Sequence, residues 1–197
     1  MSETDFNLDT YWQEQNDAHQ KCAQKTAELL KDDFSKILGA CHSAIKNGNK
    51  ILFCGNGGSA ADAQHLATEL TVRFINDRAP IAALALTTDT STLTAAGNDM
   101  GFDHIFSRQI EALGKKGDVL FAISTSGNSP NILNALKTAQ EKEIKTVALT
   151  GRDGGKMIAL SDQSLIVPAQ ETARIQEMHI LLGHMLCGAL EQKLGFA

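Results

Sequence analysis

The stretch ILFCGNGGSAADAQHLATEL, residues 51–70, contains the pattern that decides the fold. It opens with a short apolar run, passes through a glycine-rich turn and continues into a segment of helical character. A strand, a glycine-rich turn and a helix in this order are typical of phosphate-binding loops in α/β proteins. His65 and Glu69 are four residues apart on the expected helix, so their side chains share one face. The stretch raises the question whether this helix also carries catalytic groups.

Beyond this stretch, short apolar runs alternate with amphipathic segments. Runs of this length between helical patterns are typical of parallel strands buried on both faces. The sequence therefore predicts an α/β fold, with a doubly wound five-stranded parallel sheet flanked by helices. A final helix is predicted over residues 171–194. The five expected strands are residues 51–55, 81–86, 118–124, 146–151 and 164–168.

An added N-terminal helical region is predicted for residues 1–48. Apolar residues between Leu29 and Ile45 recur at spacings of three and four, which indicates an amphipathic helix. The stretch around Trp12 is more polar, and we expect it to pack against another subunit. The chain has no internal repeat or linker. We therefore expect one domain over 1–197, with its α/β core and C-terminal helix in 49–197.

Composition excludes several classes of protein. The 197 residues are 43% hydrophobic and carry a net charge of −5 without any basic run, which argues against direct nucleic-acid binding. The four cysteines are scattered, which favours a reducing compartment. The N-terminus has no signal-peptide pattern, and no apolar run approaches the roughly 20 residues that span a bilayer. We expect a cytoplasmic protein without membrane contact.

Two segments rich in glycine and hydroxyl groups follow expected strands. They are GNGGSA, residues 55–60, and STSGNS, residues 124–129. In parallel α/β sheets ligands bind at the carboxyl ends of the strands, where free N–H groups and hydroxyls can hold an anion. A purely structural turn is about equally plausible for either segment alone. Together they predict one shared anion site, in which Ser129 also occupies the N-cap position before Pro130.

The type of anion is narrowed by what the segments lack. A dinucleotide fingerprint requires an acidic residue about 20 positions on, at the end of the second strand. Asp77 precedes that strand and Asp89 lies too far along, so this interpretation fits poorly. The absence of a G-K-[ST] lysine argues against nucleoside triphosphates. A monophosphate, such as that of a sugar, needs only the donors present.

The C-terminal helix carries polar groups within an apolar stretch, ARIQEMHILLGHML, residues 173–186. Gln176 and His184 can face one side, although they are separated by about 12 Å along the helix axis. Glu177 is a rival carboxylate near the face of His184, and His179 is the expected structural histidine. Burying polar groups without partners is costly, which favours a site here. A zinc-like ion could be held by His65, Glu69, Gln176 and His184, although His65 and Glu69 alone could form a plain surface pair.

Several other polar residues have weaker claims to function. Asn98 and Asp99 lie between apolar residues at an expected element boundary, where a turn and a substrate-hydroxyl contact are about equally plausible. His19, His42 and His104 are interpreted as structural.

Four segments in the same order carry a family resemblance. They are CGNGGSAADAQHLATEL, GNDMGFDHIFSRQIEALGKKGDVLFAISTSGNS, ALTGRDGGKM and RIQEMHILLGH. From about residue 48 to the C-terminus they resemble the sugar-isomerase (SIS) family and, within it, the phosphoheptose isomerases. The resemblance implies enediol isomerisation of sedoheptulose 7-phosphate to D-glycero-D-manno-heptose 7-phosphate, in the synthesis of ADP-heptose for lipopolysaccharide. It also implies a homotetramer with active sites at subunit interfaces.

The resemblance assigns roles by position. It implies that Glu69 and His184 are the acid–base pair. It implies a zinc ion held by His65, Glu69, Gln176 and His184. The substrate-binding positions that it implies are Asn56, Gly57, Gly58, Ser59, Arg73, Asn98, Asp99, Ser124, Thr125, Ser126, Ser129 and Gln176. Arg73, one turn past Glu69, is expected to contact substrate or tune Glu69.

One position departs from the isomerase pattern. Ala173 stands three residues before Gln176, where the isomerases often have Asp. The segments ARIQEMH, TTDT and LTAAGND also resemble a sister branch, SIS-fold tetramers that bind the replication initiator DnaA without catalysis. That branch lacks the glutamate corresponding to Glu69, which this chain retains. A non-catalytic DnaA partner and a sugar-phosphate-sensing module are therefore the alternatives.

Overall fold

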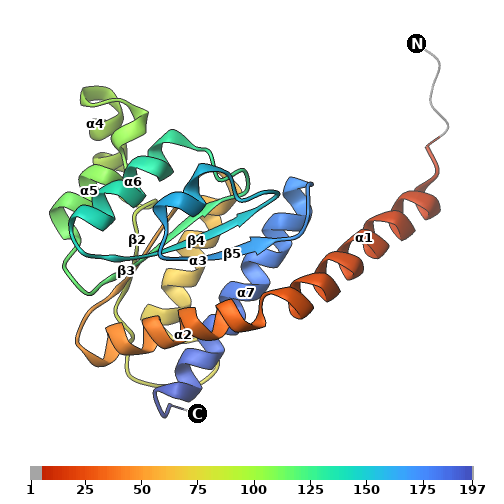
Figure 1. Ribbon diagram of the computed structural model, residues 1–197, viewed down its shortest axis with the longest axis horizontal. Coiled ribbons are helices and arrows are strands. Elements are labelled where there is room, and N and C mark those ends of the chain that lie inside the picture. The colour runs from red at the N-terminus through yellow and green to blue at the C-terminus, as the bar shows by residue number, and fades with distance from the viewer. Residues whose placement is uncertain (1–5, 197) are drawn as a thin grey trace.

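After two initial helices the chain alternates strands and helices (Figure 1). The computed structural model describes residues 6–196. The N-terminal helices are α1 (Leu8–Leu29) and α2 (Lys31–Lys46). The strands are β1 (Ile51–Gly55), β2 (Ala83–Ala85), β3 (Val119–Ser124), β4 (Lys145–Gly151) and β5 (Gln163–Val167). The helices after β1 are α3 (Gly58–Thr71), α4 (Thr90–Asp99), α5 (Ser107–Leu113), α6 (Pro130–Glu141) and α7 (Thr172–Lys193), with 3₁₀ turns η1 (Phe102–His104) and η2 (Gly155–Leu160).

The five strands form one parallel sheet in the order β2-β1-β3-β4-β5. This confirms the predicted doubly wound sheet and all five strands. The edge strand β2 is shorter than expected. The N–H of Ile81 donates to the carbonyl of Leu70 at the end of α3, and hydrogen bonding to β1 begins with the carbonyl of Ala82, which accepts from Ile51.

Helices cover both faces of the sheet, α2, α3 and α7 on one side and α5 and α6 on the other (Figure 1). Alternate residues of the central strands enter different cores, as the geometry of a strand requires. Ile51 and Phe53 belong to the core with α2, α3 and α7. Leu52 and Cys54 belong to the core with α5 and α6. Burial on both faces explains why these strands are continuous apolar runs.

The N-terminal part of helix α1 projects away from the sheet (Figure 1), whereas its C-terminal part packs on α7, where Cys22 and Thr26 are buried. The side chains of Leu8 and Trp12 are 60% and 68% exposed. The predicted N-terminal helices are confirmed, whereas the packing of Trp12 against another subunit stays a prediction. Among residues 6–196, no helix combines the length and apolar character that a membrane span requires. All four cysteines are free and buried.

Candidate active site

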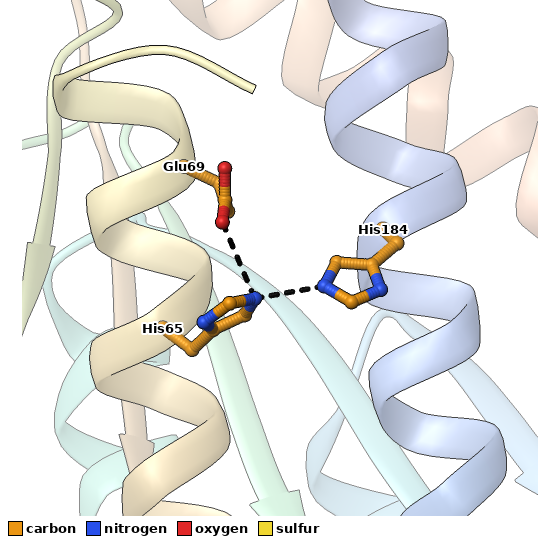
Figure 2. Close-up of side chains that lie close together, drawn as sticks. All are labelled: His65, Glu69 and His184. Atoms are coloured by element: carbon orange, nitrogen blue, oxygen red, sulfur yellow. Dashed lines mark hydrogen bonds and ion pairs between the residues drawn. The ribbon is translucent and has the colours of Figure 1, made fainter. Parts of the chain in front are cut away.

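Helices α3 and α7 make a close approach where Gly183 faces Leu66. A Cβ atom on residue 183 would clash with Cδ2 of Leu66, so a side chain there would push the helices apart. His184 follows Gly183 on α7, and His65 precedes Leu66 on α3. Their Nε2 atoms lie 2.8 Å apart (Figure 2). Helix packing thus joins two histidines that are 119 residues apart in the chain.

Glu69 completes a three-residue cluster with these histidines (Figure 2). Its Oε1 atom is 3.3 Å from Nε2 of His65, and one ligand atom from each of the three residues lies within 4.8 Å of the others. Two histidines and a glutamate form a donor set that proteins use for catalytic zinc. Nitrogen and carboxylate lone pairs that converge from two helices fit a divalent cation.

Gln176 lies apart from this cluster within the same chain. A Cβ atom on residue 58 would clash with Nε2 of Gln176, so this amide packs on Gly58 at the start of α3. Gly58 precedes His65 by seven residues, about 10 Å along a helix. The structure therefore joins Gln176 to the first glycine-rich loop and not to the His65–Glu69–His184 cluster.

The other polar residues of α7 have partners elsewhere. Glu177 accepts from His19 at 2.8 Å and pairs with Arg174 at 2.6 Å, so it is no rival to Glu69 in the cluster. His179 is buried, and its Nε2 lies 3.1 Å from the carbonyl oxygen of Thr150, to which it donates. Burial lowers the pKa of His179 to about 4, although the bond to Thr150 opposes the shift. His179 is thus a neutral structural histidine, as expected.

The two glycine-rich loops lie side by side because β1 and β3 are neighbours, with Gly55 in register with Ile123. Neither helix that follows has a side-chain cap, although Ser129 occupies the predicted N-cap position of α6. The hydroxyl of Ser129 lies instead 3.3 Å from that of Ser124. Among residues 6–196, the N–H groups of Gly58 and Asn131 have no hydrogen-bond partner and remain available to an anion at this edge of the sheet, whereas those of Ser59, Ala60 and Ile132 already donate to backbone carbonyls.

Asn131 joins the two loops, and no sequence pattern predicts this role. Its side-chain amide exchanges two hydrogen bonds with that of Asn56, both 2.9 Å long. Asn131 is 1% exposed, so it fixes Asn56 from within the core.

Among the other residues expected at the anion site, Ser59 and Ser124 are nearly buried. Gly57 and Gly58 are exposed, whereas Thr125 and Ser126 are half-buried. These residues all lie in the two loops at the carboxyl ends of β1 and β3.

Three expected substrate contacts lie away from these groups. Arg73 was expected one helical turn after Glu69, but α3 ends at Thr71 and Arg73 lies beyond it. The side chain of Arg73 is exposed and has no ion pair among residues 6–196. Asn98 donates to Asp99 at 2.7 Å on the last turn of α4. Helix α4 lies on the far side of the molecule from α7 (Figure 1).

Asp62 is a second residue that the sequence pattern did not reveal. It precedes His65 by one turn of α3, and its Oδ2 atom is buried without a hydrogen-bond partner among the described residues. Burial raises the pKa of Asp62 to about 6, although the nearby His65 opposes the shift. An unpaired carboxyl group beside the cluster marks this face of α3 as polar.

Comparison with known proteins agrees with this geometry. The family model described as "SIS domain" matches residues 15–151. The chain is 55% identical over 177 residues to the phosphoheptose isomerase of Aliarcobacter butzleri (strain RM4018), covering 90% of this chain and 94% of that protein. It is 53% identical over 181 residues to phosphoheptose isomerase 1 of Campylobacter jejuni subsp. jejuni serotype O:2, covering 92% and 95%.

Solved structures give the same result. The structure is similar to phosphoheptose isomerase GmhA from Neisseria gonorrhoeae, with a TM-score of 0.90 and 47% identity over 94% of this chain and all of that one. It is also similar to a phosphoheptose isomerase from Francisella tularensis, with a TM-score of 0.92 and 38% identity over 95% of this chain and all of that one. The matched family model, the relatives and the shared architecture together show that this chain belongs to the SIS domain family.

Proposed function

We propose that the chain is a phosphoheptose isomerase that converts sedoheptulose 7-phosphate to D-glycero-D-manno-heptose 7-phosphate, for ADP-heptose and lipopolysaccharide synthesis. The observation that carries this proposal is the cluster of His65, Glu69 and His184 between α3 and α7. Carboxylate and imidazole groups at this spacing can move protons between adjacent atoms of a substrate. Relatives more than half identical over most of their length have the name phosphoheptose isomerase.

The reaction moves the carbonyl group from C2 to C1 without gain or loss of atoms. Glu69 takes the proton from C1, and the electron pair of that bond forms the C1–C2 double bond of an enediol. His184 gives a proton to O2 and later accepts the proton of O1. Glu69 returns its proton to C2, which leaves the carbonyl at C1.

The same residues would hold a zinc ion, with His65, Glu69 and His184 from one chain. When bound, zinc would act as a Lewis acid that polarises the oxygens of the substrate. Oε1 of Glu69 lies 3.3 Å from Nε2 of His65, and a carboxylate has a second oxygen that could take the proton of the substrate. Because Gln176 packs on Gly58 within its own chain, it would contact the zinc ion only across a subunit interface. We therefore assign its amide to substrate binding.

The loops would hold the phosphate at the opposite end of the sugar. Ser59, Ser124 and Ser129, with Thr125 and Ser126, offer hydroxyls beside the uncapped starts of α3 and α6. Asn56, Gly57 and Gly58 would line the path from the phosphate to the reacting carbons. Binding energy gained at the phosphate orients the reacting end and so lowers the barrier there.

We further propose one SIS domain over 1–197, assembled as a homotetramer in which the helices of 1–48 build the interfaces. Gly58 precedes Glu69 by eleven residues, about 16 Å along α3, which exceeds the length of an extended heptose phosphate. The loops of one chain and the cluster of another would therefore form one site, and Asn98, Asp99 and Arg73 could reach it from a neighbour.

Exposed apolar side chains support the same assembly. A groove of about 270 Å³ between α1, α2 and α7 is lined mainly by apolar residues, including Leu30, Phe34 and Met185. Trp12 lies exposed further along α1. Light scattering of the purified protein tests the tetramer, and Trp12→Asp is expected to dissociate it. We also propose a cytoplasmic location, in keeping with four free, buried cysteines.

The decisive experiment is an isomerase assay with sedoheptulose 7-phosphate and detection of the aldoheptose phosphate. Glu69→Gln is expected to lower kcat by about 10²–10⁴-fold, the usual contribution of general acid–base catalysis. Glu177→Gln is the matched control, because Glu177 is a carboxylate on α7 that pairs with His19 and Arg174. Turnover that survives Glu69→Gln undiminished would contradict the assigned role. Metal analysis of the same sample, before and after treatment with a chelator, tests the zinc.

The alternative of a non-catalytic DnaA partner makes the opposite prediction. It requires binding to DnaA without isomerase activity, whereas the presence of Glu69 beside His65 favours catalysis. A pull-down with DnaA alongside the assay separates the two functions. A sugar-phosphate sensor would bind the substrate tightly and leave it unconverted in the same assay.

A further inference from the structure

The segment that follows α3, residues 72–78, is held by one carboxylate from α7. Glu191 accepts the backbone N–H groups of Phe74 at 3.1 Å and of Ile75 and Asn76 at 3.4 Å. It also accepts from Nε of Arg78 at 2.7 Å. Both side chains of this ion pair are only 1% exposed. A residue 113 positions away therefore fixes the path of the chain as it leaves α3.

Arg78 holds the end of α3 from the other side. Its Nη2 donates to the carbonyl of Glu69 at 2.9 Å, and its Nη1 donates to the carbonyl of Leu70 at 2.8 Å. The last carbonyls of a helix have no partner within the helix, and a guanidinium group satisfies them and the helix dipole together. Arg78 thus caps the turn of α3 that carries Glu69.

The same segment reaches His184. The ring of Phe74, whose N–H is held by Glu191, stacks on the imidazole of His184 with 5.6 Å between ring centroids and 25° between planes. Gly188 on α7 leaves room for Phe74, because a Cβ atom there would lie 3.2 Å from that ring. The Arg78–Glu191 ion pair therefore contacts the backbone of Glu69 directly and reaches His184 through Phe74.

We propose that Arg78 and Glu191 are positioning residues for the acid–base pair of Glu69 and His184. The proposal rests on the proposed isomerase function. Buried ion pairs seldom stabilise a protein more than well-packed apolar residues would, because desolvation offsets their attraction. What this pair supplies is a fixed geometry, since all four bonds to Glu191 and both bonds to the end of α3 are directional.

Lys50 and Asp118 provide an internal comparison. Asp118 is also 1% exposed, and it accepts from the N–H groups of Lys50 and Lys115 and from Nζ of Lys50 at 2.6 Å. Its partners lie before β1 and before β3, away from α3, α7 and residues 72–78. Breaking either pair should lower stability, whereas only breaking Arg78–Glu191 should also disturb the catalytic geometry.

The experiment compares Glu191→Gln and Arg78→Lys with Asp118→Asn. For the two test variants kcat with sedoheptulose 7-phosphate should fall by about 10- to 100-fold with KM little changed, because small misplacements act on the reacting geometry. Their affinity for Co²⁺, titrated against a chromogenic chelator, should weaken by about tenfold or more. Asp118→Asn should lower Tm by a similar amount while kcat and Co²⁺ affinity stay at the wild-type level.

Test variants that keep wild-type kcat and Co²⁺ affinity would overturn the proposal, because the pair would then be a structural anchor only. If Glu191→Gln fails to fold, Phe74→Leu tests the link to His184 with the ion pair intact, and unchanged Co²⁺ affinity there would overturn it. A wild-type protein without isomerase activity would refute the proposed function. The Co²⁺ titration would still decide the positioning role in that case.

Discussion

The two ends of helix α3 are held in opposite ways. At its start, beside the edge of the sheet where the two loops meet, Gly57 provides no side-chain cap, and the N–H group of Gly58 has no hydrogen-bond partner among the described residues. At its other end, Arg78 satisfies the carbonyls of Glu69 and Leu70, and Glu191 anchors the chain that follows. An open start can accept an anion from outside, whereas a closed end keeps a carboxylate in place. One helix thus combines a binding end with a rigid end.

The largest effect on the open end is expected from Gly58→Ala. The new Cβ atom would clash with Nε2 of Gln176, so this amide must leave its position beside the first loop. We expect kcat/KM to fall by about tenfold or more, since misplaced substrate contacts cost orders of magnitude. Steady-state kinetics with sedoheptulose 7-phosphate measures the change.

Gly39→Ala is the matched control for this substitution. Gly39 lies within α2, and among residues 6–196 no neighbouring group lies within 4 Å of the position that its Cβ atom would take. Alanine there should therefore raise stability by up to about 1 kcal/mol through helix propensity. Its kinetics should match those of the wild type. Equal kinetics for both variants would show that Gln176 is not needed where it lies.

An intermediate effect is expected from Asn131→Ala, which breaks the tie between the two loops. The substitution leaves the amide of Asn56 without its partner and should cost about 1–3 kcal/mol of unfolding free energy. We also expect KM to rise several-fold with kcat nearly unchanged, because the phosphate end is loosened and the closed end is untouched. Urea unfolding and kinetics check both parts. A fall in kcat alone would mean that the two ends are coupled.

The smallest effect concerns how stability depends on pH at Asp62 and Glu191. Burial raises the pKa of Asp62 to about 6, from 3.8, so its contribution to stability is lost as pH rises through this range. Burial also opposes ionisation of Glu191, but the N–H groups of Phe74 and its neighbours and the bond from Arg78 lower its pKa overall. Its contribution is therefore present above pH 4.5 and lost as pH falls.

The two carboxylates should give difference curves of opposite slope. Between about pH 3 and 7, Asp62→Asn should gain stability relative to the wild type as pH rises from 3.8 to about 6, whereas Glu191→Gln should lose it as pH rises toward 4.5. Thermal unfolding of both variants and the wild type across this pH range provides the curves. Difference curves of the same slope for Asp62→Asn and Glu191→Gln would contradict the contrast between the unpaired Asp62 and the paired Glu191.

Much of the fold could be predicted because it depends on local periodicity. The five apolar runs became the five strands, and the glycine-rich turn after β1 leads into a helix as expected. Ser129 is the N-cap residue of α6 as predicted, although its hydroxyl turns to Ser124 instead of capping the helix. Helical spacing places Arg73 on the face of Glu69, but α3 ends at Thr71.

The candidate site was predicted only in part from the sequence. The spacing of His65 and Glu69 placed them on one face of a helix, and the interpretation as a plain surface pair remained open. Gln176 was predicted to share an ion with His184 in spite of about 12 Å between them along the helix axis, whereas the structure has Gln176 on Gly58. Asn131 and Glu191 have no local pattern that distinguishes them from other polar helix residues.

The sequence by itself determined the strands, the helices and the loops, because the period of apolar residues and the position of glycines act within a few residues. Only the tertiary structure decided which polar groups meet. His65 and His184 come together because Gly183 lets α7 pack closely on Leu66 of α3. Arg78 and Glu191 meet because the segment that leaves α3 runs along α7, which brings together residues more than a hundred positions apart.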